Sequence, residues 1–171
     1  MNYYTLRHFD VANGQGVRCS LFVSGCNNHC PGCFNSCAKA FDAGQPFTKE
    51  IEDDILKTVE SKYIEGLSLL GGDPMATPNQ YALLPFLHRY REKFGDTKPI
   101  WCWTGYVYET ELITEDGRGR CEVTDEFLSL IDVLIDGPFV QSLYDIRLKF
   151  RGSSNQRILQ LHPFKDVSKS I

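Results

Sequence analysis

The sequence predicts an α/β fold in which a mainly parallel sheet forms an open, partial β/α barrel. Three observations support this prediction. Short apolar runs alternate along the 171 residues with segments whose apolar side chains recur at helical spacing. Such alternation implies right-handed crossovers between parallel strands, and there are too few strand–helix units to close an eight-fold barrel. At this length we expect a single domain, spanning residues 1–171.

Five short apolar runs are predicted to be strands. They cover residues 17–23, 66–70, 100–103, 132–135 and 158–161. Because the carboxyl ends of parallel strands lie at one edge of a sheet, the loops after the first four strands should meet there. These loops carry the most distinctive residues, namely the cysteines that follow residue 25 and the turns 71–74, 104–106 and 136–139. We therefore expect the functional site at this edge.

Three helices are expected between these strands, and a threonine marks the start of each. Thr48 is predicted to cap the first helix and Thr124 to cap the third. Thr77 and Gln80 match a capping box on the second helix, and Pro78 suits its first position because that position needs no N–H donor. All three starts are therefore assigned to side-chain capping.

Each predicted helix carries an apolar face. The faces comprise Ile51, Ile55, Leu56, Val59 and Tyr63 in the first helix, Leu83, Leu84, Leu87 and Tyr90 in the second, and Phe127, Leu128 and Ile131 in the third. Pro85 is expected to bend the second helix. The polar segment 115–120 is predicted to be a solvent loop with no face toward the core.

The composition excludes several classes of protein. Hydrophobic residues at 42% and aromatic residues at 12% suffice for a core and exclude wholesale disorder. The net charge of −4 gives no basis for binding nucleic acid by phosphate neutralisation. No apolar run approaches the roughly 20 residues of a membrane helix, and the first residues do not form a signal peptide. We expect a soluble cytoplasmic protein with neither nucleic acid nor a membrane as a partner.

Three of the seven cysteines lie within eight residues, directly after the strand predicted at 17–23. Cys26, Cys30 and Cys33 have the spacing C-x3-C-x2-C. A tight loop of this kind can hold a 4Fe-4S cluster, with each thiolate on a different iron. Three protein ligands leave the fourth iron open, and an open iron can bind and activate a substrate. The pattern therefore predicts metal or redox chemistry.

Two other interpretations of the cysteine loop remain open. A zinc site would need a further ligand pair, which does not follow, although His29 and Cys37 could complete a compact site. A ferredoxin-like electron carrier would use Cys37 as a fourth ligand, because Cys30, Cys33 and Cys37 continue a C-x2-C-x3-C run. The longer first gap and the alanine after Cys37 speak against the carrier. The open three-cysteine cluster is favoured.

Motifs in order from about residue 13 to residue 157 resemble those of a known superfamily. The C-x3-C-x2-C loop after a strand is similar to the signature of the radical S-adenosylmethionine superfamily. A narrower resemblance, to the activating proteins of anaerobic ribonucleoside-triphosphate reductase, is carried by residues 14–18, 21–26, 30–35, 71–74, 103–106, 132–138 and 150–157. One position departs from the wider superfamily, because Gly32 precedes the third cysteine where an aromatic residue is usual, and Phe34 follows it.

This resemblance implies an enzyme with a partial barrel of the superfamily type and two cofactors, a 4Fe-4S cluster on Cys26, Cys30 and Cys33 and S-adenosylmethionine on its open iron. It implies reductive cleavage of S-adenosylmethionine and hydrogen abstraction from a glycine of the partner, the anaerobic reductase. We expect an electron donor such as flavodoxin or ferredoxin, and a homodimer is possible. The cofactors carry the chemistry, so no catalytic side chain is assigned. An activase of another glycyl-radical enzyme, such as pyruvate formate-lyase, is the alternative.

Six residues are expected to bind the cofactor: Gly32, Cys33, Phe34, Gly71, Gly72 and Asp73. The two glycines after the second predicted strand would let backbone carbonyls approach a ligand. The superfamily's related motif receives the methionine ammonium, for which an acid such as Asp73 is suited. A tight turn between a strand and a helix would explain the same residues.

A local basic patch lies between Arg147 and Arg157 in this acidic chain. A solvated face is the usual explanation of such a run. The patch could also bind the cofactor carboxylate or dock the partner, and we favour docking. Charge reversal at Arg151 is then expected to weaken complex formation more than cofactor cleavage.

Overall fold

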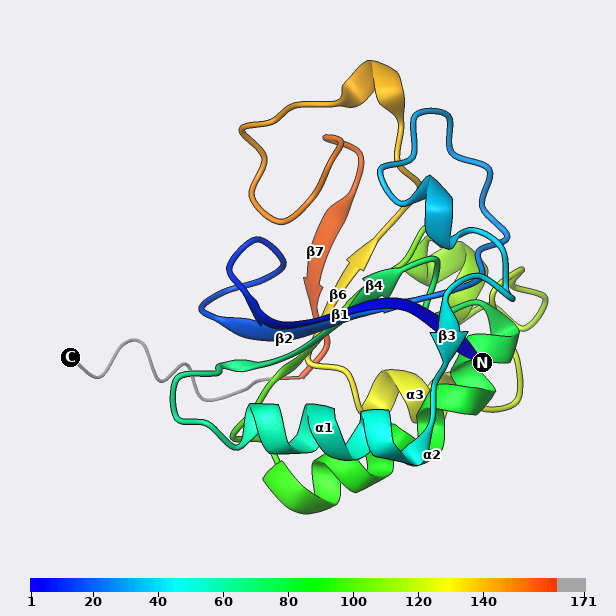
Figure 1. Cartoon of the computed structure of the whole chain (residues 1–171). Helices are drawn as coiled ribbons and strands as arrows, with labels where there is room; N and C mark the ends of the chain where they lie inside the picture. The colour runs from blue at the N-terminus through cyan, green and yellow to red at the C-terminus, as the bar shows by residue number, and fades with distance from the viewer. Residues whose placement is uncertain (163–171) are drawn as a thin grey trace.

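The computed structural model describes residues 1–162, which form one open seven-stranded sheet with three helices on one face (Figure 1). The strand order is β3-β1-β2-β4-β5-β6-β7. The strands are β1 (Asn2–Asp10), β2 (Arg18–Val23), β3 (Gln45–Pro46), β4 (Gly66–Gly71), β5 (Ile100–Trp103), β6 (Val133–Asp136) and β7 (Arg157–Gln160). The helices are α1 (Lys49–Val59), α2 (Thr77–Phe94) and α3 (Thr124–Ser129), with short helical turns η1 (Ser36–Ala38), η2 (Tyr108–Leu112) and η3 (Gln141–Leu143).

The centre of the sheet confirms the predicted parallel arrangement, whereas its two edges do not follow it. Strands β2, β4, β5 and β6 are parallel neighbours. Strand β7 runs antiparallel to β6, and β1 runs antiparallel to both β2 and β3 at the opposite edge. The fold is therefore mixed α/β with an open sheet, and the partial barrel of the superfamily type stays a prediction.

Strand β1 is an addition to the expected elements, in which residues 17–23 form the first strand. Its residues range from exposed to buried without a continuous apolar run. Two register shifts interrupt its pairing with β2. A strand near the edge of an antiparallel pair can be solvated on one side, so it does not need the apolar pattern that marks a central strand. This is why the sequence pattern does not reveal β1.

Two rows of side chains cross the parallel strands on opposite faces of the sheet. Leu21, Leu69, Cys102 and Leu134 are paired neighbours in one row, are fully buried and pack in the core beneath the helices. The opposite face carries a second, smaller cluster: Trp101, Trp103, Val133, Ile135 and Phe150. The helical layer thus covers one face, and the other face is left to the loops that build the site.

Helix α1 begins where the sequence predicts but without the predicted side-chain cap, and its predicted apolar face is confirmed in part. Thr48 is the N-cap residue, although its side chain makes no capping hydrogen bond. Ile55, Leu56 and Val59 are buried as expected. The helix ends at Val59, however, so Tyr63 lies beyond it with 72% of its surface exposed. The assignment of Tyr63 to the apolar face was wrong.

The capping predictions for α2 and α3 are also wrong, because polar side chains turn inward instead. Ala76 is the N-cap residue of α2, and Thr77 makes no capping bond. Thr124 lies within α3, and its hydroxyl donates to Gln80 Oε1 at 2.7 Å. Helix α2 passes through Pro85 without ending. Buried polar groups need partners, and here the partner comes from another helix rather than from the helix terminus.

The segment 115–120 is not wholly a solvent loop, which corrects the prediction. Gly119 is buried against Tyr106 and Leu112, and a Cβ at this glycine would lie 2.9 Å from atoms of both. Its carbonyl accepts a hydrogen bond of 2.7 Å from Gln80 Nε2. The loop is therefore fastened to α2.

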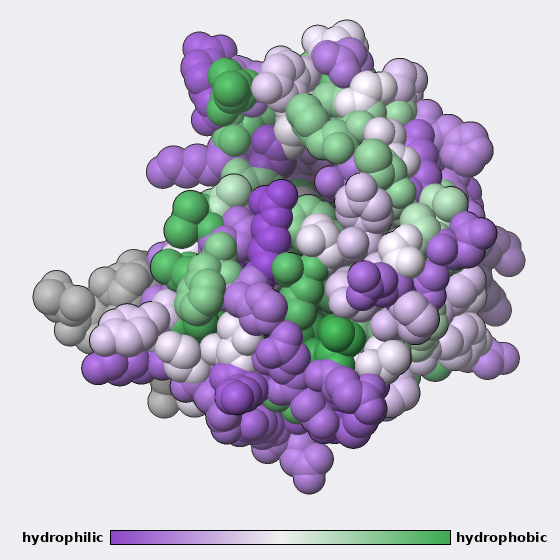
Figure 2. Space-filling model, in the orientation of Figure 1, coloured by the Kyte–Doolittle hydropathy of each residue, from purple (hydrophilic) through white to green (hydrophobic). Residues whose placement is uncertain are grey.

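The outer surface of the helical layer is hydrophilic, as Figure 2 shows at the bottom of the view. Lys49, Glu50 and Asp53 of α1 are among its exposed residues. Within residues 1–162, no helix has both the length and the apolar character needed to cross a membrane.

Candidate functional site

A cavity of about 440 Å³ lies where the loops after β2, β4, β5 and β6 come together. The cysteine loop contributes residues 26, 28, 30 and 33–35, and the turns after β4 and β5 contribute residues 71–73 and 103–105. Gly137 and Phe139 follow β6, and residues 150–152 precede β7. Phe22 and Leu70 reach the cavity from the sheet itself. The predicted meeting of these loops is confirmed.

Three half-buried free thiols line the cavity, those of Cys26, Cys30 and Cys33. Cys37 is exposed and does not line the cavity. Among residues 1–162, no three His, Cys, Asp or Glu side chains are grouped so as to hold one metal ion. A four-iron cluster does not need that grouping, because each thiolate binds a different iron.

Backbone hydrogen bonds hold the start of the cysteine loop against its neighbours. The Gly25 amide donates to the Ala38 carbonyl at 2.8 Å, and the Asp73 amide donates to the Gly25 carbonyl at 2.8 Å. The Cys26 amide donates to the Lys39 carbonyl at 3.0 Å. The first cysteine is thus placed by η1 on one side and by the turn after β4 on the other.

Gly71 and Gly72 are required by the close approach of two backbones. Gly71 has φ of 110°, and a Cβ there would lie 2.7 Å from backbone atoms of Phe22. A Cβ at Gly72 would lie 2.5 Å from the Gly25 carbonyl oxygen and 2.9 Å from that of Ala38. Both glycines also line the cavity. Their first role is therefore to let the cysteine loop pack on the end of β4.

Asp73 joins three loops through a carboxylate that is only 1% exposed. Its Oδ2 accepts from Asn28 Nδ2 at 2.9 Å and from the Gly105 amide at 3.0 Å. Its Oδ1 accepts from the Thr104 hydroxyl at 2.8 Å and from the Met75 amide at 2.9 Å. Burial raises the pKa of Asp73 to about 6, although these four hydrogen bonds favour the charged form. A ligand ammonium would have to displace one of these donors.

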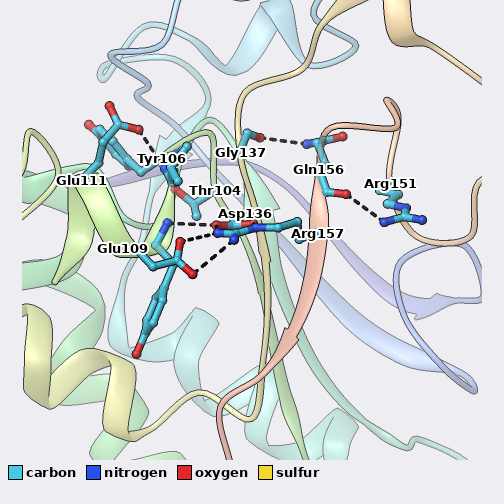
Figure 3. Close-up of polar contacts among 11 residues, drawn as sticks. Thr104, Tyr106, Glu109, Glu111, Asp136, Gly137, Arg151, Gln156 and Arg157 are labelled. Atoms are coloured by element: carbon cyan, nitrogen blue, oxygen red, sulfur yellow. Dashed lines mark hydrogen bonds and ion pairs between the residues drawn. The ribbon is translucent and has the colours of Figure 1, made fainter.

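An ion-pair network stiffens the wall that follows β6 (Figure 3). Asp136 is buried and accepts from Nε of Arg157 at 3.0 Å and from its Nη2 at 2.5 Å. Arg157 also donates to Glu109 of η2 at 2.6 Å. These hydrogen bonds to Asp136 and Glu109 raise the pKa of Arg157. The end of β6 is thereby tied to both η2 and β7.

The predicted basic patch is divided between the cavity wall and the outer surface. Arg151 lines the cavity and its Nη1 donates to the Gln156 carbonyl at 2.8 Å (Figure 3). Its Nε is buried and has no hydrogen-bond partner in the described part of the chain. The Arg147 side chain is 86% exposed and pairs with Asp145, two residues away. The two arginines therefore face different surroundings.

Aromatic rings border the cavity. Phe34 is 67% exposed and packs on Phe139 and Tyr144, with ring centroids 5.0 and 5.7 Å away. Trp103 Nε1 donates to the Phe150 carbonyl at 2.7 Å. Phe150 has φ of 60°, a left-handed conformation that is strained for a residue with a side chain. Flat apolar surfaces thus lie beside the polar loops.

This chain is similar in sequence to known proteins over most of its length. Residues 12–159 match a family described as a 4Fe-4S single cluster domain. The anaerobic ribonucleoside-triphosphate reductase-activating protein of Escherichia coli strain K12 is 43% identical over 163 residues, which cover 94% of this chain and 99% of that protein. Proteins of the same name from Haemophilus influenzae and Enterobacteria phage T4 are 44% and 35% identical, cover 96% and 92% of this chain, and match over 99% and 93% of their own lengths.

This chain belongs to the family of anaerobic ribonucleoside-triphosphate reductase-activating proteins. The resemblance predicted from the motifs is confirmed. In this member of the family, the cavity is lined by most of the residues predicted for the cluster or the cofactor: Cys26, Cys30, Cys33, Phe34, Gly71, Gly72 and Asp73. Gly32 does not line it. Gly32 adopts φ of 71° and faces Gln141, whose Oε1 would lie 1.9 Å from a Cβ at this position.

Several residues at or near the site of this reductase-activating protein were not predicted from the sequence. Phe22 and Leu70 could have been found from the period of two, since they alternate with Leu21 and Leu69 along β2 and β4. No local signal marks Arg118, which reaches the cysteine loop from the segment 115–120.

Proposed function

We propose that this chain is the activating enzyme of an anaerobic ribonucleoside-triphosphate reductase and that it generates a glycyl radical on that protein. The relatives that bear this name cover 92% to 96% of the chain, which supports the choice of partner. One observation carries the chemistry. Cys26, Cys30 and Cys33 line a single cavity as free thiols, whereas Cys37 lies outside it.

The chemistry of the three cavity thiols fits a 4Fe-4S cluster with one iron left open. The backbone amide of Asn28 donates to Cys26 Sγ at 3.3 Å, and such a donor stabilises a thiolate ligand. Burial, with the negative charge of Asp73, raises the pKa of the Cys26 thiol to about 11. This thiol is therefore protonated at neutral pH until iron displaces its proton.

A 4Fe-4S cluster bound by Cys26, Cys30 and Cys33 would pass one electron from an external donor to S-adenosylmethionine, and the chemistry supplied in this way would be reductive cleavage of that cofactor and abstraction of a hydrogen atom from a glycine of the reductase. The residues of this chain bind, orient and exclude water. Gly71 and Gly72 give the cavity a wall without side chains. Arg151 offers positive charge to a carboxylate, and Phe34 offers a flat face to the adenine. No step needs a proton from a side chain, so no catalytic residue is assigned.

The position of Cys37 disfavours the four-cysteine electron carrier, because this exposed residue does not line the cavity that the other three cysteines line. The names of the relatives disfavour an activase of pyruvate formate-lyase. We also propose that this chain is a cytoplasmic single domain over residues 1–171, that it can form a homodimer, and that a protein such as flavodoxin or ferredoxin serves as its electron donor.

The test is anaerobic reconstitution with iron and sulfide, followed by reduction in the presence of S-adenosylmethionine. We expect 5′-deoxyadenosine, and a glycyl signal in electron paramagnetic resonance when the anaerobic reductase is added. Pyruvate formate-lyase serves as the control partner and should give no signal. Full cluster content without 5′-deoxyadenosine would overturn the radical mechanism, and a signal on pyruvate formate-lyase alone would overturn the choice of partner.

A further inference from the structure

We propose that Arg118 is a positioning residue, which holds the cysteine loop in its working shape by binding Asn28. The inference deepens the proposed function and rests on it for the role of the loop. The contacts themselves belong to the chain alone. Arg118 lies 90 positions after Asn28, in the segment 115–120.

Asn28 is held from both ends of its side-chain amide. Its Oδ1 accepts from Arg118 Nη2 at 2.8 Å, and its Nδ2 donates to Asp73 Oδ2 at 2.9 Å. Arginine only donates and a carboxylate only accepts, so one orientation of the amide satisfies both. Asn28 is 6% exposed and lies between Cys26 and Cys30. The middle of the segment between the first two cysteines is therefore fixed.

Arg118 is itself held in place by two other groups. Its Nε donates to Glu111 Oε1 at 2.7 Å, and its guanidinium carbon lies 4.5 Å from the centroid of the Tyr106 ring. Glu111 is fixed in turn, since its Oε2 accepts from the Val107 amide at 2.7 Å. A planar guanidinium can stack on a ring and bind two acceptors at once, which an ammonium cannot do. Arg118 thus reaches Asn28 with its orientation already set.

The segment that carries Arg118 is anchored to the body of the protein independently of the cysteine loop. The Gly119 amide donates to the Glu111 carbonyl at 2.9 Å, and the Gly119 carbonyl accepts from Gln80 at 2.7 Å. The ion pair of Arg120 with Asp125 at 2.6 Å is exposed to solvent and contributes little, so Gly119 and Gln80 supply the anchor. Arg118 can restrain the cysteine loop only if its own segment is rigid, because a mobile segment would move together with that loop.

The first test measures amide hydrogen exchange in the metal-free protein. Arg118→Met keeps the apolar stem over Tyr106 and removes the donors, and it should speed exchange at residues 27–30 about tenfold. Asn28→Ala removes the bond to Asp73 as well and should speed exchange at least as much, and combining it with Arg118→Met should add nothing to the effect of Asn28→Ala. Arg118→Lys keeps one donor and should restore part of the protection. Arg120→Met is the matched control, since it loses an ion pair on the same segment without a contact to Asn28, and should leave residues 27–30 unchanged.

The second test measures iron release to a chelator after reconstitution, which should be severalfold faster in Arg118→Met than in Arg120→Met. Exchange in the central strand β4 reports whether each variant folds. Unchanged exchange at residues 27–30 in folded Arg118→Met, or additive effects in the double variant, would overturn the positioning role. If the unmodified protein forms no 5′-deoxyadenosine, the proposed function is overturned, whereas the positioning role of Arg118, which is measured by exchange in the metal-free protein, is not affected.

Discussion

Asn28 Nδ2 donates a hydrogen bond of 2.9 Å to Oδ2 of Asp73, and this bond joins the cysteine loop to the turn after β4. The same oxygen accepts from the Gly105 amide at the end of β5. Three of the loops that form the site are thus connected through one buried carboxylate, in addition to the sheet that bears them. The shape of the cavity therefore depends on Asp73.

Asp73→Asn is expected to lower the free energy of unfolding by about 2 kcal/mol. Asparagine replaces one carboxylate oxygen of Asp73, which accepts two hydrogen bonds, by an amide nitrogen that can only donate. That nitrogen would face two other donors. If the new amide nitrogen faces Thr104 and Met75, the Thr104 hydroxyl can rotate to accept but the Met75 amide loses its partner. Urea unfolding of the metal-free protein at pH 7.5 measures the effect. Asp125→Asn, at an exposed ion pair, is the control and should change stability by no more than about 1 kcal/mol. Equal stability of the two variants would contradict the role of Asp73 in joining the loops.

The raised pKa of Asp73 predicts a pH dependence of stability. The folded-state pKa of about 6 lies above the ordinary value of 3.8, so the stabilisation from protonated Asp73 is complete below about pH 3.8 and is lost as the pH rises through 6. The difference in unfolding free energy between the unmodified protein and Asp73→Asn should fall over this window and then stay constant. Urea unfolding from pH 4 to pH 8 measures it. A constant difference would show an ordinary pKa at Asp73.

Cys37→Ala is expected to retain the iron and sulfide content of the unmodified protein after anaerobic reconstitution. The reason is that Cys37 lies outside the cavity that Cys26, Cys30 and Cys33 line. Cys33→Ala, the matched variant within the cavity, should lose most of the iron. If both variants lose iron to the same extent, the four-cysteine carrier is the better account.

Gly72→Ala is expected to destabilise the protein by about 2 kcal/mol or more, because the new Cβ would meet the carbonyl oxygens of Gly25 and Ala38, which belong to the backbone. The cysteine loop would have to move, so iron retention should fall as well. Gly95→Ala is the control. Gly95 has φ of 53° and no other atom within 4 Å of a Cβ, so only the conformational cost of about 1 kcal/mol applies there. Thermal and urea unfolding compare the two variants.

Arg151→Met is expected to raise the KM for S-adenosylmethionine about tenfold, because Arg151 lies in the cavity wall and a charge-assisted hydrogen bond to a carboxylate would be lost. This reverses the order of effects expected from the sequence, in which docking of the partner is affected first. Arg147→Met removes the exposed arginine of the same segment and should leave this KM unchanged. Steady-state formation of 5′-deoxyadenosine and reductase pull-down separate the two effects, and weaker binding with an unchanged KM in Arg151→Met would restore the docking role.

Five of the seven strands in the described part of this protein follow from local pattern, whereas β1 and β3 do not. All five predicted strands differ from the observed ones by at most one residue at each end. A period of two and a bounded apolar run are properties of neighbouring residues, so they can be read without knowing the fold. The same holds for the spacing of Cys26, Cys30 and Cys33. The family match supports a 4Fe-4S cluster in this chain, and the assignment of that cluster to these three cysteines stays a prediction.

The wrong predictions about helix caps and about the direction of β7 depended on partners far away in the sequence. Gln80 and Thr124 have the residue types that favour caps, yet they bond to each other across 44 positions because both are buried. Strand β7 lies within one residue of its predicted bounds. Its antiparallel direction depends on pairing with β6, where Arg157 at the start of β7 binds Asp136 at the end of β6.

The sequence by itself determined the class of fold, the four central strands with β7, and the spacing of the three clustered cysteines, because these are matters of short-range spacing and apolar pattern. Only the tertiary structure decided that Asp73 joins the loops, that Gly72 admits a neighbouring backbone, and that Arg118 binds Asn28. Each of these contacts exists because burial forces polar groups and backbones from distant segments to satisfy one another.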